Sequence, residues 1–524
     1  MAVHARRGAA AAVAADAPGL ATSGPAAHDA APDSARRVRF DALDAVRGLA
    51  ALAVVGFHAY KDIVKGAPGG SGAGTTIAYS LSWGVPVFFV LSGFLIYLPF
   101  AEALAGRRPM PDTARYLWRR AWRVLPGYWL ALVVFGTLAH PGTLWTPVGV
   151  VRYFLLLQLF DYQTIYHVLG TAWTLALEMS FYLALPVLAA AFAGFISAIE
   201  RHTEEPRHGR RPGLSRPRAG SHLVAIAGFA LGGIVLTRLL VQPLYAALGQ
   251  DPRLGYFTLL DAAPMFAGGM ALAAVRAHAD ELSPWLARLP RRLSAVAGRD
   301  TTWLVLAAAA YVAGLRFEGN AVTPWQPTYL ALAAATLLLV PLVLRPEGRV
   351  ALSLGRRRPL AWLGAVSYGL YLWHWPVQEL LMAHGWAVPH TWAGYALALA
   401  TVLSISLPLA WLTHRLVERT AIEWSRRHAP SDVLSAGRRP WASLQSHAVL
   451  RALIVARTTT PAGAGTRVHS SSPAAPSAGG SSSRGAAERS PRAAARAAKG
   501  GAACRTQPAV ARRREADSPT TSSA

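Results

Sequence analysis

Long apolar runs dominate the sequence, and they constrain the fold more than any other feature. Most of them reach the roughly 17–25 residues that an α-helix needs to cross a bilayer. The runs are Leu43–Ala59, Ala78–Ala101, Val124–His140, Val148–Phe160, Gly170–Ile199, Leu223–Leu248, Gly255–Val275, Thr301–Leu315, Pro327–Leu344, Ala361–Ala383 and Trp392–Leu416. Only 15% of residues are charged, against about 25% in soluble proteins. The sequence therefore predicts an all-α, polytopic integral membrane helix bundle.

Arginine-rich loops alternate with loops that carry few basic residues, and this alternation predicts the orientation of the helices. The arginine-rich segments are the leader before residue 40 and the stretches 107–123, 201–218, 276–299 and 345–358. Such loops stay in the cytoplasm. The alternation holds only if the short run Val148–Phe160 is re-entrant or interfacial. We therefore predict ten transmembrane helices in a bacterial plasma or inner membrane, with both termini cytoplasmic.

The composition divides the chain into three parts. Residues 1–35 are rich in alanine and are predicted to be a disordered cytoplasmic leader. Residues 36–427 hold the apolar runs and form the membrane domain. Residues 428–524 are a basic, low-complexity segment rich in Ser, Ala, Gly and Pro, which we predict to be a disordered cytoplasmic tail.

Charge and cysteine content exclude several classes of function. The formal net charge is +25, but most arginines lie in short clusters between apolar runs, so the charge indicates membrane orientation and no nucleic-acid partner. The single cysteine, Cys504, lies in the tail. Disulfides within the chain, cysteine-rich zinc sites and a cysteine acyl-enzyme in the membrane domain are therefore excluded. We predict no metal and no bound cofactor.

Ionisable residues inside apolar runs are costly and mark candidate functional positions. With the predicted orientation, His58, Glu178 and His374 fall at comparable depth on three helices, in the outer half of the membrane. A histidine beside a carboxylate is the usual general-base pair, so we expect Glu178 to orient or support His58. The alternative is a structural polar network that holds the helices together.

A second cluster lies toward the cytoplasmic side. Arg120 and Arg123 are three residues apart and share one helical face, where two guanidinium groups could bind phosphates. The alternative is plain membrane anchoring by positive charge. Arg47 lies near the inner surface, about 16 Å along its helix from His58. Arg238 and Asp261 are expected to pair as a structural ion pair.

Five motifs follow one another along the chain: RFDALDAVRGLAALAVVGFH, FFVLSGFLI, RRAWRVLPGYW, AWTLALEMSFYLALP and SYGLYLWHWPV. In this order they resemble membrane acyltransferase family 3, the O-acetyltransferase-like acyltransferases of bacterial surface carbohydrates. The resemblance covers roughly residues 36–420. It implies about ten membrane helices and transfer of an acetyl or other short acyl group from cytoplasmic acyl-CoA to a hydroxyl of a sugar or related acceptor.

The resemblance also assigns roles to individual residues. It implies that His58 is the essential histidine and that Arg120 and Arg123 form the family's Arg-X-X-Arg motif. Trp173, Thr174 and Glu178 match a Trp-Ser-Leu…Glu element, with Thr174 where the family has Ser. We therefore predict His58 and Glu178 as catalytic residues. The predicted substrate-binding residues are Arg47, Arg120, Arg123, Trp173, Thr174, Tyr368 and His374.

The sequence thus predicts an acyl-CoA-dependent O-acyltransferase with a carbohydrate or glycoside acceptor, embedded in a lipid bilayer. The alternative is a multi-pass transporter or flippase, which would also place His, Glu and Arg in a polar cavity. The acceptor, the acyl group and the oligomeric state stay open at this stage.

Overall fold

The computed structural model describes residues 33–64, 73–203, 218–288, 290–315 and 326–430. All of them belong to the first of two compact units, Met1–Leu450, and the second unit is Arg451–Ala524. Regular structure in the described ranges is helical throughout. The predicted leader and tail lie almost wholly outside these ranges.

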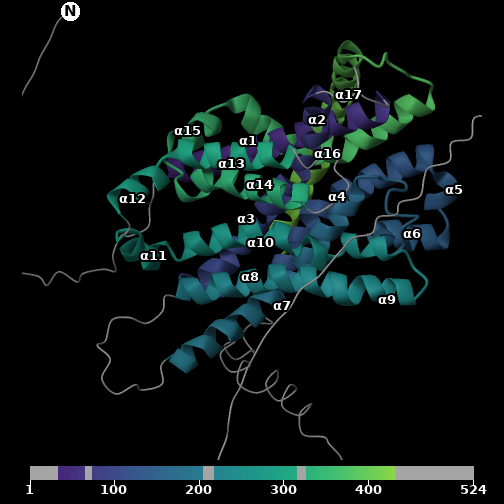
Figure 1. Ribbon diagram of the computed structural model, residues 1–524. Coiled ribbons are helices and arrows are strands. Elements are labelled where there is room, and N and C mark those ends of the chain that lie inside the picture. The colour runs from purple at the N-terminus through teal and green to yellow at the C-terminus, as the bar shows by residue number, and fades with distance from the viewer. Residues whose placement is uncertain (1–32, 65–72, 204–217, 289, 316–325, 431–524) are drawn as a thin grey trace, which may run out of the picture. The chain divides into compact units, whose positions relative to one another are not determined.

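The helices follow the apolar runs of the sequence (Figure 1). The long helices are α1 (Asp33–His58), α3 (Gly84–Leu104), α4 (Thr113–Ala139), α7 (Ala172–Thr203), α8 (Arg218–Leu236), α10 (Leu259–Ala277), α13 (Asp300–Leu315), α14 (Gln326–Leu344), α16 (Arg358–Ala383) and α17 (Trp392–Thr413). The short helices are α2 (Ala73–Ser80), α5 (Pro141–Leu144), α6 (Pro147–Phe154), α9 (Gln242–Ala247), α11 (Ala279–Leu286), α12 (Arg291–Ala297), α15 (Arg349–Gly355) and α18 (Arg419–Arg427). Six π- or 3-10 turns join or extend them: η1 (Ala59–Ile63), η2 (Leu81–Trp83), η3 (Leu157–Phe160), η4 (Thr237–Val241), η5 (Pro252–Phe257) and η6 (His414–Glu418).

The all-α membrane fold is confirmed, while the predicted count of ten spans is approximate. Seven described helices are long and apolar enough to cross a membrane, and the bent pair α14–α15 makes an eighth. The other two predicted runs are helical but fall short of that standard. Helix α13 has 16 residues, or about 24 Å. Helix α16 has 26 residues but carries Ser367, His374 and Gln378 among its apolar ones.

The short run Val148–Phe160 does not form a membrane-length helix. It folds as the eight-residue α6 and the turn η3, separated near Leu156, whose backbone is left-handed with φ 60°. The segment packs on α4, where Tyr128 and Trp129 donate side-chain hydrogen bonds of 2.6 and 3.0 Å to carbonyls of α6. An α-helix of this length rises only about 12 Å, so the predicted non-spanning role agrees with the structure.

Glycines let the central helices approach one another to backbone contact. A Cβ atom added at Gly269 of α10 would lie 1.9 Å from the carbonyl oxygen of Val90 in α3, and one at Gly93 would lie 2.2 Å from that of Phe266. Beside this contact the rings of Phe181 and Phe266 stack at 4.1 Å. Small residues at helix interfaces are the usual means of close packing in membranes.

The arginine-rich loops meet at one end of the bundle. Arg107 after α3 pairs with Asp280 of α11, and Arg345 after α14 lies 3.1 Å from Asp300 of α13. Figure 1 shows α11, α12 and α15 at this end, and α5, α6 and α9 at the other. We call the first the basic end. Its composition fits a cytoplasmic location under the positive-inside rule.

The topology can be tested by cysteine labelling. In a Cys504→Ser background, Gln250→Cys and Ala287→Cys place single thiols at exposed positions on opposite ends of the bundle. We expect a membrane-impermeant maleimide to label Gln250→Cys in intact cells and Ala287→Cys only after permeabilisation. Labelling of both positions from outside would contradict the orientation.

The α3–α10 contact can be tested by adding one methyl group. We expect Gly269→Ala to lower thermal stability, because overpacking typically costs about 1–3 kcal/mol and the nearest neighbour is backbone that cannot swing away. Gly228→Ala is the matched control, since nothing lies within 4 Å of its added Cβ. Equal melting temperatures for the two variants, measured on detergent-solubilised protein, would show that the contact tolerates a side chain.

Candidate functional site

His58 and a carboxylate one turn further along the chain form a hydrogen-bonded pair. The chain continues from α1 into η1, and this turn brings Asp62 under the imidazole, with His58 Nδ1 2.8 Å from Asp62 Oδ2. The two side chains are only 15% and 18% exposed. When Nδ1–H donates to the carboxylate, Nε2 is the ring atom that can accept a proton.

His58 and His374, which the sequence predicts only to lie at comparable depth, are neighbours in the structure. The centroids of the two rings are 5.4 Å apart, and the indole of Trp375 meets the His58 ring edge-on at 4.9 Å. His374 is fully buried in α16, and its Nδ1 lies 3.2 Å from the carbonyl of Leu370. Among the described residues its Nε2 has no hydrogen-bond partner.

Glu178 lies elsewhere, so the expectation that it directly supports His58 needs correction. Its Oε1 accepts hydrogen bonds from Ser92 at 2.5 Å and from Tyr182 at 2.6 Å. These partners hold it among arginines, and Asp62 occupies the place beside His58. Similar depth in the membrane therefore does not establish which carboxylate contacts which histidine.

A cavity of about 390 Å³ collects the predicted arginines, and we call it the arginine chamber. Its charged lining residues are Asp44, Arg47, Arg120, Arg123, Glu178 and Glu418. In the part of the chain that the structure describes, Arg120 and Arg123 make no hydrogen bond or ion pair. The Nε of Arg120 is buried without a partner. Three cations in one cavity, two of them unpaired, suit an anionic ligand.

Arg47 has a different role from its two neighbours because its guanidinium already has partners. It donates to Ser367 Oγ at 2.9 Å and to the carbonyl of Gly364 at 2.6 Å, and it lies 3.1 Å from Asp44. It lines the chamber and at the same time ties α1 to α16.

Of the other predicted substrate-binding residues, Tyr368 and Thr174 line the chamber and Trp173 does not. Tyr368 lines the chamber and donates to the carbonyl of Val124 at 2.7 Å. Thr174 also lines it, and its hydroxyl lies 2.7 Å from that of Tyr371, whose ring is 5.7 Å from His374. These contacts form a continuous path from the chamber toward His58. The ring of Trp173 packs edge-on against Phe257 at 5.5 Å.

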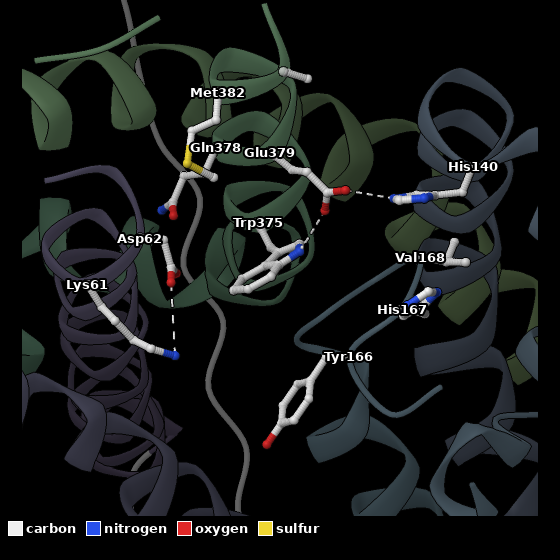
Figure 2. Close-up of a pocket in the computed structure, with 11 residues that line it drawn as sticks. Lys61, Asp62, His140, Tyr166, His167, Val168, Trp375, Gln378, Glu379 and Met382 are labelled. Carbon is white, nitrogen blue, oxygen red and sulfur yellow. Dashed lines mark hydrogen bonds and ion pairs between the residues drawn. The ribbon is translucent and has the colours of Figure 1, made fainter. Parts of the chain in front are cut away.

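A second cavity, of about 780 Å³, opens at the end of the bundle opposite the basic end. We call it the Trp375 cavity. Figure 2 shows Lys61 and Asp62 on one side of it, His140 and His167 on the other, and Trp375 between them. Glu379 accepts from Trp375 Nε1 at 3.0 Å and lies 2.7 Å from His140 Nε2.

Sequence reasoning missed the two carboxylates of this region. Asp62 follows His58 by four residues, and Glu379 follows Trp375 by four. That spacing places side chains on one helical face, so it could have suggested both pairs. Asp62 was overlooked because the first apolar run was ended at Ala59, before the π-turn that continues the helix.

Comparisons with known proteins agree on the chemistry. Residues 40–412 match a family model described as an acyltransferase domain. The chain is 24% identical over 357 residues to "Peptidoglycan O-acetyltransferase OatA" of Listeria monocytogenes, covering 64% of this chain and 49% of that protein. It is 28% identical over 411 residues to "Putative membrane-bound transacylase BcsY" of Komagataeibacter xylinus, covering 74% of this chain and 83% of that protein.

The chain thus spans about half the length of the Listeria relative. No solved structure matches it. Because the family match extends over most of the chain and includes every residue of both cavities except Glu418, this protein belongs to acyltransferase family 3 as a multi-pass membrane acyltransferase.

Proposed function

We propose that this protein transfers an acetyl or other short acyl group from cytoplasmic acyl-CoA to a hydroxyl of a carbohydrate or glycoside acceptor. The family match supports acyl transfer, and one relative is named for O-acetylation of peptidoglycan. The observation that carries the proposal is the His58–Asp62 hydrogen bond beside the Trp375 cavity. A hydroxyl is a weak nucleophile, and such a pair provides the base that it needs.

The arginine chamber is the proposed donor site. Acyl-CoA carries phosphates, and the unpaired guanidinium groups of Arg120 and Arg123 can bind them with paired, directional hydrogen bonds. Helix α4 begins at Thr113, within the arginine-rich segment 107–123 at the basic end, and Arg120 and Arg123 lie in its first turns. The donor would therefore enter from the side on which acyl-CoA is made.

We place the acyl end of the donor along Thr174, Tyr371 and His374, whose side chains lie in series between the chamber and His58. The thioester end of acyl-CoA is carried on a long flexible arm, so the phosphates can stay near the arginines while the acyl group extends toward His58. Glu178 would then act within the chamber. Held by Ser92 and Tyr182, it is one of the three carboxylates that balance the charge of the three arginines in the chamber lining.

The proposed reaction is direct attack by the acceptor. His58 Nε2 takes the hydroxyl proton as the acceptor oxygen bonds to the thioester carbonyl carbon. The carbon–sulfur bond then breaks, the acyl group stays on the acceptor oxygen, and the CoA thiolate leaves with a proton. Asp62 stabilises the imidazolium that forms between the two proton transfers. Direct attack is favoured because the membrane domain has no cysteine to carry the acyl group.

The base can be tested with three variants. We expect His58→Ala and His58→Gln to lower acyl transfer about 10²–10⁴-fold, because glutamine keeps hydrogen bonding but cannot take the proton. Asp62→Asn should lower kcat while leaving the KM for acyl-CoA unchanged. The readout is thiol release by purified protein with its acceptor.

The matched comparison for Asp62→Asn is Glu178→Gln, which removes the other candidate carboxylate. We expect it to change the KM for acyl-CoA rather than the proton-transfer step. Near-normal transfer by folded His58 variants would refute the assignment of the base. A transporter would release no thiol under any condition, which separates that alternative from an enzyme.

The donor site can be tested on α4. We expect Arg123→Ala to raise the KM for acyl-CoA about 10–100-fold, since a hydrogen bond to a charged group contributes about 1.5–3 kcal/mol. Arg123→Lys should rescue poorly because an ammonium cannot reproduce the planar fork. Arg119→Ala is the control, an exposed arginine on the same helix outside the chamber lining. If Arg119→Ala and Arg123→Ala change donor kinetics equally, the chamber is not the donor site.

A further inference from the structure

We propose that the Trp375 cavity binds a neutral saccharide, and that the amide of Gln378 is its recognition group. The inference rests on the proposed function, because it names the site and the residue through which the acceptor is held beside His58. It begins from a feature that neither acyl transfer nor helix packing explains: an amide side chain that is buried without a partner.

Gln378 lies on α16 in the cavity wall and is 1% exposed. Within the described ranges, neither its Nε2 nor its Oε1 has a hydrogen-bond partner. Burying an amide in this state lowers stability, because both groups lose their bonds to water. A ligand that fills the cavity could supply both missing bonds. Gln378 is therefore better suited to binding a ligand than to stabilising the empty protein.

The hydrogen-bonding groups of the Gln378 amide indicate which class of ligand can bind to it. It offers one acceptor and two donors side by side, and a pair of neighbouring sugar hydroxyls offers the same combination in return. Glu379 on the next position adds a carboxylate acceptor that already fixes His140 and Trp375. Among the residues that line the cavity, Lys61 carries a permanent positive charge, while Asp62 and Glu379 carry carboxylates. With one permanent positive charge against two carboxylates, this cavity suits a neutral polyol better than a phosphate-rich ligand, whereas the arginine chamber has three guanidinium groups for its three carboxylates.

Trp375 supplies a rigid apolar surface at the same place. Its Nε1 is held by Glu379, and its ring fills the space that Gly170 leaves, since a Cβ there would lie 2.4 Å from the indole. The indole also touches the edge of the His58 ring. Fixed aromatic surfaces with a few convergent polar groups are typical of small-molecule sites. A sugar held between Trp375 and Gln378 would have its hydroxyls next to the proposed base.

The test uses wild type, Gln378→Met and Ser406→Ala in lipid nanodiscs free of glycoside detergents, whose headgroups would compete. Cellobiose and chitotriose are the probes, and binding is followed by calorimetry. We expect the wild type to bind at least one probe, and Gln378→Met to raise its Kd about tenfold or more through loss of two hydrogen bonds. Ser406 Oγ is also buried and has no hydrogen-bond partner among the described residues, but it lies on α17 outside the cavity lining, so Ser406→Ala should leave Kd unchanged.

Thermal stability separates ligand recognition from packing. We expect the melting temperature of Gln378→Met without saccharide to equal or exceed that of wild type, because methionine has a similar shape and no unpaired polar atom. A large fall would show that Gln378 has a structural role and would overturn the proposal. So would an unchanged Kd in Gln378→Met, or the absence of binding of both probes to wild type.

The saccharide site can also be tested in the wild-type protein by measuring methionine oxidation. Met382 lines the cavity, whereas Met110 lies before α4 near the basic end. The bound probe should slow peroxide oxidation of Met382 and leave that of Met110 unchanged. Equal oxidation rates of Met382 with and without saccharide would contradict the site.

Thiol release from acyl-CoA is measured in parallel to keep the two proposals distinguishable. Lack of thiol release with every acceptor would overturn the proposed function, while the binding data would still decide the role of Gln378. Transfer to cellobiose with an unchanged acceptor KM in Gln378→Met would overturn this inference and leave acyl transfer intact.

Discussion

The contact between α1 and α16 is the constraint on which the rest of the site depends. Gly48 and Gly364 allow the two backbones to meet, since a Cβ added at Gly364 would lie 2.1 Å from the carbonyl of Asp44. Arg47 secures the crossing by donating to Gly364 and Ser367. With the helices fixed there, three turns further along α1, His58 reaches His374 and Trp375. A wider crossing would move His58 away from His374 and Trp375.

The two cavities are lined by different side chains, so they suit different ligands. The arginine chamber holds unpaired cations near the basic end, while the Trp375 cavity holds carboxylates, an indole and an unpaired amide at the opposite end. Tyr371 in the chamber lining packs against the buried His374, whose ring in turn lies beside that of His58. A charged donor and a neutral acceptor could thus approach one base from opposite sides without sharing a route.

Local rules predicted a large part of this architecture. Hydrophobic run length located ten helical segments, and the short length of Val148–Phe160 together with the alternation of arginine-rich loops correctly set that run apart. The expected ion pair between Arg238 and Asp261 is present at 2.9 Å. Run length predicted the number of crossings only approximately, because α13 is short for a span and α16 interrupts its apolar residues with Ser367, His374 and Gln378, which it buries against neighbouring helices.

The sequence by itself determined the fold class, the family motifs and the candidate residue types, because apolar length, charge and ordered motifs are properties of the chain alone. Only the tertiary structure decided which side chains meet. It placed Asp62 beside His58 and Glu178 beside Ser92, since partners are set by helix rotation and crossing angle as well as depth. It also revealed Gln378 as a buried amide without a partner, a property that exists only when the surrounding helices have excluded water.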